Sequence, residues 1–143
     1  MAQEVADLTP RDGWEVHATP HSFDDLVART RDAISENGLA VVTQAGPTGA
    51  AANRGIEIPG NRIIGAFNNQ FAVRILELST AAMIEAPVRF YVTENADGTA
   101  TLSYKRPSMV FAPYADEGGA ALGDAASELD EIFAAIADSA ATR

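Results

Sequence analysis

Two histidines carry the most versatile side chains in this sequence, since a neutral imidazole can act as a general base or bind a metal ion. His17 and His21 are four residues apart, but Pro20 lies between them, so they do not share one face of a helix. A zinc ion needs three or four ligands, and the chain has no cysteine to add to this pair. The sequence therefore predicts no metal site, and it leaves any cofactor unknown.

A catalytic site would have to be minimal, built around His17, Arg62 or Asn68. The serines lack the Gly-x-Ser-x-Gly context of a nucleophile elbow. Three glycines between residues 46 and 55 could cradle an anion, but no Lys-Ser or Lys-Thr pair follows them as in a phosphate-binding loop. These observations favour a turn-rich connection over residues 47–60, and a non-catalytic protein over an enzyme.

The segment PSMVFAPY, residues 107–114, is more apolar than a loop needs to be. An exposed apolar loop marks a ligand or partner surface, whereas a buried one closes an end of the core, and both interpretations stay open here. With Met83 from a predicted helix, the candidate ligand-binding residues are His17, Arg62, Asn68, Met83, Met109, Phe111 and Tyr114.

Three amphipathic helices are predicted to position these residues, over 23–36, about 70–84 and about 121–139. Ser22 followed by Asp25 is typical of a helix N-terminus, and Asn37-Gly38 favours the left-handed backbone that ends a helix. Residues 1–12 are expected to form a loose arm, residues 50–53 a single helical turn, and residues 108–119 a loop or a short helix.

Alternating apolar and polar residues predict strands over 14–18, 39–44 and 62–67 and a hairpin over 88–104, which turns at Asp97-Gly98. Val88, Phe90 and Val92 are expected on its helix-facing side. The order strand, helix, strand, loop, strand, helix, two strands, helix predicts an α+β fold. We expect one domain over residues 13–140, with a mostly antiparallel sheet and helices packed on one face.

The polar side of this hairpin is unusually poor in charge, with Arg89 as its only charged residue. A solvated strand face would carry more lysine and glutamate, whereas tyrosine and arginine are enriched in protein interfaces. A homodimer through this face is expected, and a solvated, threonine-rich face is the alternative. The candidate dimer-face residues are Arg89, Tyr91, Thr93, Thr101 and Ser103, with Glu15 and His17 expected beside them.

Charge excludes some partners. Twenty acidic and ten basic residues give a formal net charge of −10, so the mean field repels nucleic acids and anionic membranes. No apolar run approaches the ~20 residues of a membrane span. Nine of the ten basic residues are arginine, which indicates the high-GC codon usage of many bacteria. The compartment stays open: the cytoplasm, or the periplasm if a leader has been removed.

Three strings, LAVVTQAG, NRIIGAFNN and APVRFYVTENADGTATLSY, make the sequence resemble the DUF302 family, a domain of unknown function. The resemblance covers residues 14–139 and is most specific from Arg62 to Tyr104. It implies a TBP-like α+β fold and a homodimer, and it brings no catalytic motif. Many members have a Phe-Gly-Asn-Pro turn where this chain has Phe67-Asn68-Asn69-Gln70.

Two functional hypotheses follow. The favoured one is a dimeric module that binds a small, apolar molecule between sheet and helices or that binds another protein. The alternative is a small enzyme of unknown reaction that uses His17, Arg62 or Asn68.

Overall fold

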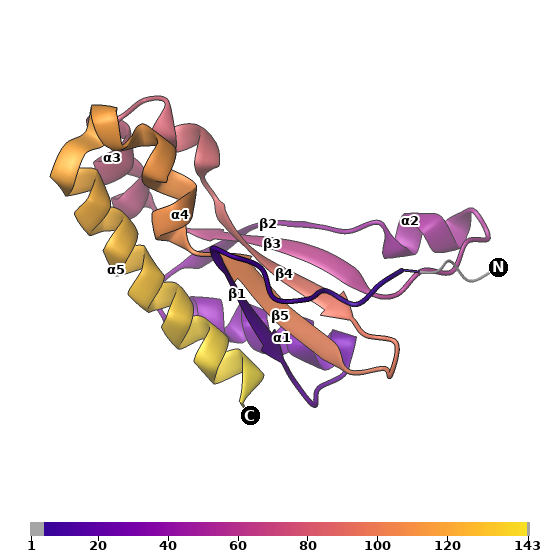
Figure 1. Cartoon of the computed structure of the whole chain (residues 1–143). Coiled ribbons are helices and arrows are strands. Elements are labelled where there is room, and N and C mark those ends of the chain that lie inside the picture. Colours follow the sequence, from indigo (N-terminus) through magenta and orange to yellow (C-terminus); the bar gives the residue numbers. More distant parts are fainter. Residues whose placement is uncertain (1–4, 143) are drawn as a thin grey trace.

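An antiparallel sheet of five strands organises the chain (Figure 1), which a computed structural model describes over residues 5–142. Every pair of neighbouring strands is antiparallel, so the expected sheet type is confirmed. The sheet order is β1-β5-β4-β3-β2, with β1 (Trp14–Ala18), β2 (Ala40–Ala45), β3 (Asn61–Phe67), β4 (Val88–Glu94) and β5 (Ala100–Lys105).

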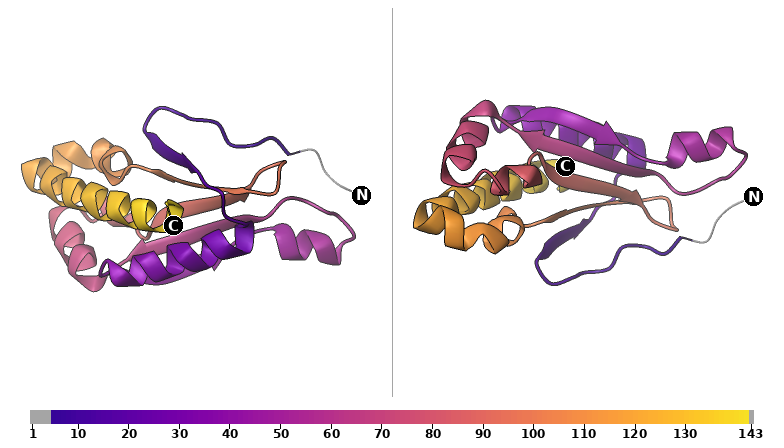
Figure 2. Two further views of the ribbon diagram at one scale, coloured as in Figure 1. Left: turned by 90° about the horizontal axis from the view of Figure 1, so that it is seen from below. Right: turned by 90° about the horizontal axis from the view of Figure 1, so that it is seen from above.

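The two long helices cover one face of this sheet. Seen from above in Figure 2, the sheet lies in front of α1 (Phe23–Glu36) and α5 (Ala115–Ala141), and from below both helices lie in front of the sheet. The expected α+β fold with helices on one face is therefore confirmed. The remaining helices are α2 (Thr48–Asn53), α3 (Asn69–Leu78), the 3₁₀ turn η1 (Ala82–Glu85), α4 (Pro107–Phe111) and the 3₁₀ turn η2 (Ala112–Tyr114).

The hydrophobic core fills the space between the sheet and these two helices. Phe90 on the central strand β4 is fully buried and stacks on Phe133 of α5, with ring centroids 4.4 Å apart. Val88 and Val92 are buried on the same side, which confirms the helix-facing side of the hairpin. Tyr104 from β5 meets both phenylalanine rings edge to face. These aromatic rings fill the centre of the layer between the sheet and α5.

The predicted helix over 70–84 is wrong in its second half. Helix α3 ends at Leu78, and Ser79 takes an extended backbone. The Ser79 hydroxyl accepts a hydrogen bond from the Ala82 amide, which starts η1 instead. Serine competes in this way with helical hydrogen bonds.

The segment 108–119 is more helical than expected. Helix α4 and the turn η2 lead directly into α5, which kinks at Gly119, where φ is +63°.

The side chains of β1 that were expected beside the dimer-face residues lie on the opposite face of the sheet. Glu15 pairs with Tyr104 and His17 with Leu102, so both side chains lie on the helix-covered face. The expectation that they flank the dimer-face residues is therefore wrong. The other sheet face, here called the helix-free face, carries the alternate residues of each strand. These include Trp14, Val16, Ile63, Arg89, Tyr91, Thr93, Thr101, Ser103 and Lys105.

The arm before β1 is partly anchored. Its described residues, 5–12, form no regular helix or strand, and the Asp7 carboxylate accepts a hydrogen bond from the Ala96 amide in the hairpin turn. Residues 1–4 of the expected arm lie outside the described residues. Within residues 5–142 no helix is long and apolar enough to cross a membrane.

Candidate functional site

A recess of about 440 Å³ opens on the helix-free face, where the sheet meets α4 and η1. We call it the sheet groove. Its lining comes from four strands and two short helices, so elements far apart in the chain build it together. The lining residues are Trp14, Ile63, Glu85, Val88, Arg89, Phe90, Tyr91, Tyr104, Lys105, Met109 and Val110.

Trp14 is the only tryptophan of the chain and lies at the β1 side of the groove. The Lys105 ammonium lies 5.8 Å from the centre of the indole ring, and the Arg11 guanidinium lies 5.5 Å from it. Cations at this distance are attracted by the electron-rich face of the ring. This side of the groove therefore joins a large apolar surface to positive charge.

The Tyr91 ring is held in place by its hydroxyl group, which accepts a hydrogen bond of 2.7 Å from the side-chain amide of Asn61. Ile63 is the partner of Tyr91 on the neighbouring strand β3 and is half-buried. These two residues give the groove an apolar floor with a fixed shape.

The apolar segment 107–114 contributes residues both to the hydrophobic core and to the lining of the sheet groove. Phe111 is buried and belongs to the core. Tyr114 packs against the core and donates a 2.5 Å hydrogen bond to the Glu85 carboxylate, and this bond raises the Tyr114 pKa. Met109, with 36% of its surface exposed, lies at the rim of the groove. Met83 lies in η1 and packs against the core.

The three residues of the minimal enzyme site lie in different surroundings. Arg62 extends over the Phe23 ring and donates to Gln44. Asn68 caps α3 by accepting from the Phe71 amide and donates to the Gly38 carbonyl, which accounts for its polar groups. Neither residue lines a described recess that contains His17.

His17 lies in a second recess, of about 560 Å³, between the β1–β5 edge and α5. Its ring stacks on Tyr104 with centroids 6.5 Å apart, and its buried Nε2 has no hydrogen-bond partner within residues 5–142. Burial raises the pKa of Tyr104 to about 12, helped by the charges of Glu15 and Asp130. Over the described part of the chain, no three His, Asp or Glu residues come together to hold a metal ion.

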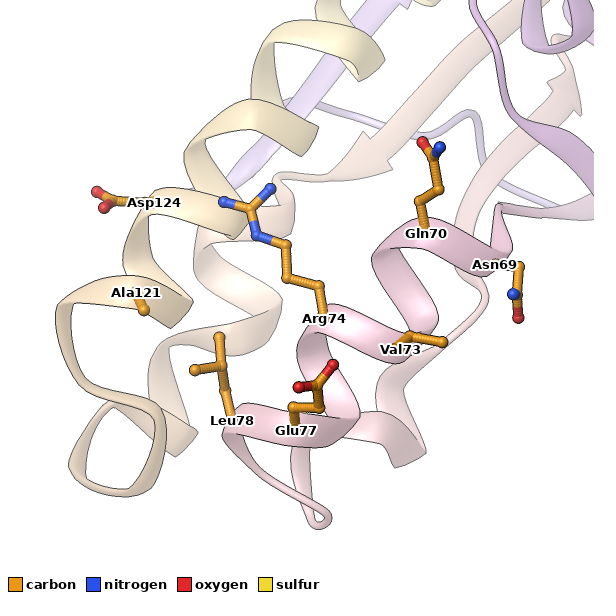
Figure 3. A pocket seen from close by; sticks show the side chains of 8 residues that line it. All are labelled: Asn69, Gln70, Val73, Arg74, Glu77, Leu78, Ala121 and Asp124. Atoms are coloured by element: carbon orange, nitrogen blue, oxygen red, sulfur yellow. The ribbon is translucent and has the colours of Figure 1, made fainter.

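A third recess, of about 590 Å³, separates α3 from α5 (Figure 3). Arg74 reaches from α3 toward α5 and forms an ion pair with Glu128. This hydrogen-bonded pair raises the pKa of Arg74 and lowers that of Glu128. The cation is thus already neutralised, and none of the sequence-predicted site residues lines this recess.

The five dimer-face candidates do share the helix-free face, but they differ in exposure. Thr101 and Ser103 are 4% and 0% exposed within one chain, and Thr101 exchanges hydrogen bonds with Asn95. Tyr91 and Thr93 are half-buried, and Arg89 is exposed. Only the last three offer much surface to a partner.

Sequence reasoning missed four important groove residues: Trp14, Ile63, Glu85 and Lys105. Two of them carry a signal in the sequence. Trp14 and Lys105 are the only residues of their types, and both lie at strand ends. Only the register, which pairs Trp14 with Lys105, brings them together.

Fold and groove together define a class: an α+β domain with one helix-covered and one helix-free sheet face. The sequence profile of the domain of unknown function DUF302 matches residues 15–139, and the chain belongs to this family. The crystal structure of an uncharacterized conserved DUF302 protein from Bacillus stearothermophilus is similar, with a TM-score of 0.79 and 19% sequence identity. The similarity covers 91% of this chain and 99% of that one, and shows the fold alone. No curated protein matches.

Proposed function

We propose that this protein is a non-catalytic module that binds a small organic molecule in the sheet groove. One observation carries the proposal: four strands and two short helices converge on a recess of about 440 Å³ beside the only tryptophan. This volume falls within the range of roughly 300–1,000 Å³ that is typical of small-molecule sites. We place the ligand in this groove and not between sheet and helices, because the stacked rings of Phe90, Tyr104 and Phe133 fill the centre of that layer.

The chemistry of the lining supports binding over catalysis. Trp14, Ile63 and Met109 supply apolar surface, which is the usual lining of a ligand site. The described lining contains no serine, cysteine or histidine, and its one lysine, Lys105, forms no ion pair with Glu85, its one carboxylate. The Glu85 carboxylate already accepts a hydrogen bond from Tyr114. The alternative enzyme would use His17, Arg62 or Asn68, and none of these residues lines the groove.

A second copy of the chain is the competing occupant of this face. The exposed Arg89 and the half-buried Tyr91 and Trp14 are residue types that interfaces favour. The concave shape of the groove, walled by α4, favours the small molecule, since a two-fold contact of sheet faces needs matching surfaces. A homodimer through the same face stays a proposal, and native mass spectrometry tests it by measuring the oligomeric state.

Native mass spectrometry of freshly purified protein tests both ideas, because it reports oligomeric state and retained ligand together. A direct measurement uses N-phenyl-1-naphthylamine, a neutral apolar dye that accepts energy from tryptophan. Binding in the groove should quench Trp14 and brighten the dye.

Two matched variants locate the binding site. Ile63→Tyr enlarges a side chain in the groove floor and should abolish dye binding. Val42→Tyr makes a similar change at a strand position outside the groove, where the valine is 54% exposed, and should leave binding intact. Loss of binding in both variants, or in neither, would refute the groove as the site. A dimer that dissociates in Ile63→Tyr would instead favour the second copy.

A further inference from the structure

Two cations at the sheet groove lack an acidic partner. The Arg89 side chain is exposed and makes no ion pair or hydrogen bond with residues 5–142. The Lys105 ammonium contacts the Trp14 ring and, over the same residues, forms no ion pair. By contrast, Arg29, Arg74 and Arg106 each pair with a carboxylate. Arg89 and Lys105 therefore face the groove with no carboxylate of the described chain that neutralises them.

The strand register sets these two cations opposite each other. Phe90 pairs with Tyr104, so the next position along this antiparallel ladder sets Arg89 opposite Lys105. Both side chains point to the helix-free face. Like charges directly opposite each other destabilise a sheet, and no described acidic group bridges these two. An anion seated between them would remove this repulsion.

The local charge of the groove is opposite to that of the whole molecule. Its charged lining residues are Arg89, Lys105 and Glu85, which leaves one net positive charge. The Arg11 guanidinium over Trp14 lies next to this cluster. The protein as a whole carries a charge of −10. An anionic ligand is therefore repelled by the mean field of the protein but attracted locally by the cations of the groove.

We propose that the ligand of the sheet groove is an organic anion. Its apolar body lies against Trp14, Ile63 and Met109, and its carboxylate, sulfonate or phosphate group lies between Arg89 and Lys105. This inference rests on the proposed function, since it names the chemical class that the groove accepts.

A matched pair of dyes tests the inference separately from the groove itself. 8-Anilinonaphthalene-1-sulfonate adds a single sulfonate to the neutral N-phenyl-1-naphthylamine. Titration of each dye, followed by energy transfer from Trp14, gives two dissociation constants. The sulfonate should bind several-fold more tightly despite the unfavourable net charge, and its advantage should shrink as salt screens the two cations.

Charge-removing variants locate the effect. Arg89→Gln and Lys105→Gln should each weaken binding of the sulfonate by roughly two- to fivefold, the size expected for exposed charge pairs. Neither should change binding of the neutral dye by as much. Arg31→Gln is the control, because Arg31 is exposed on α1, on the other side of the sheet, and its loss changes the net charge equally. Far-UV circular dichroism checks that all variants fold.

Each outcome has a separate meaning. Equal affinity of the two dyes, both lost in Ile63→Tyr, would overturn the anion preference and leave the groove standing. Equal weakening of the sulfonate by Arg89→Gln and Arg31→Gln would show that the mean field acts, and would also overturn it. If neither dye affects Trp14, the proposed function itself fails.

Discussion

The sulfur atom of Met109 occupies the space in which a side chain on Gly13 would begin. A Cβ atom on Gly13 would lie 1.8 Å from Met109 Sδ, far inside van der Waals contact. Gly13 also has a φ of +82°, a backbone conformation that favours glycine. Helix α4 therefore docks against the turn before β1 through a contact that glycine permits, and this contact places Met109 at the groove rim.

This contact predicts the cost of Gly13→Ala relative to a matched glycine. Gly38 has the same φ of +82° but open space where its Cβ would lie. Gly38→Ala should lower the free energy of unfolding by about 1 kcal/mol, from the backbone alone. Gly13→Ala should cost up to about 1 kcal/mol more, because the end of the flexible Met109 side chain must move. Urea unfolding of both variants provides the comparison.

A double variant isolates the side-chain part of that difference. Adding Met109→Ala to Gly13→Ala should remove the excess cost, so that the double-mutant cycle shows clear coupling. Equal losses for Gly13→Ala and Gly38→Ala would mean that the methionine moves aside freely.

Truncation of Phe90 tests the core between sheet and helices. Phe90→Ala removes a fully buried ring that stacks on Phe133, and should cost about 3–5 kcal/mol of unfolding free energy. Arg89→Ala, at the adjacent exposed position, should stay within about 0.5 kcal/mol of the wild type. A loss below about 1 kcal/mol for Phe90→Ala would contradict the assignment of the two faces.

Tyr104 predicts how stability changes at alkaline pH. Its pKa is raised to about 12 in the folded protein, chiefly by burial, whereas an unfolded tyrosine ionises near 10. Between these values the unfolded chain loses the proton and the folded chain keeps it, so stability falls as pH rises. The Tyr104 contribution should be fully present below pH ~10 and should decline by about 2 kcal/mol by pH ~12.

Tyr104→Phe should flatten this decline. Urea unfolding at intervals between pH ~9 and ~12 should give a shallower slope for the variant than for the wild type, with little difference at the lower end. If the unfolding free energy falls equally steeply with pH in both proteins, Tyr104 has the same pKa in the folded and in the unfolded chain.

The proposed homodimer predicts the effect of a charge on the helix-free face. Tyr91→Glu places a carboxylate where a packed interface cannot solvate it, so the variant should be monomeric at concentrations at which the wild type is dimeric. Light scattering measures both. A monomeric wild type, or a variant that stays dimeric, would defeat the dimer but leave the ligand proposal untouched.

The sequence predicts the elements of this fold better than their orientation. Ser22 and Asn37 carry enough local chemistry to fix the ends of α1, and Asp97-Gly98 does the same for the hairpin. The face on which His17 lies depends on how β1 pairs with β5, far along the chain. The groove escaped prediction for the same reason, because its walls meet only through the long-range register.

That register also dictates an order of events during folding. In the sheet, β1 pairs with β5 alone, and Trp14 meets Lys105 across 105 − 14 = 91 residues of chain. At the usual pace of ~5–20 residues per second, β1 leaves the ribosome roughly 5–20 seconds before its partner strand. Until β5 is available, Trp14 has no sheet to lie against. The groove beside Trp14 is therefore completed by the β1–β5 pairing, which has the largest sequence separation in the sheet. Pairing between strands so far apart in the chain is intrinsically slow.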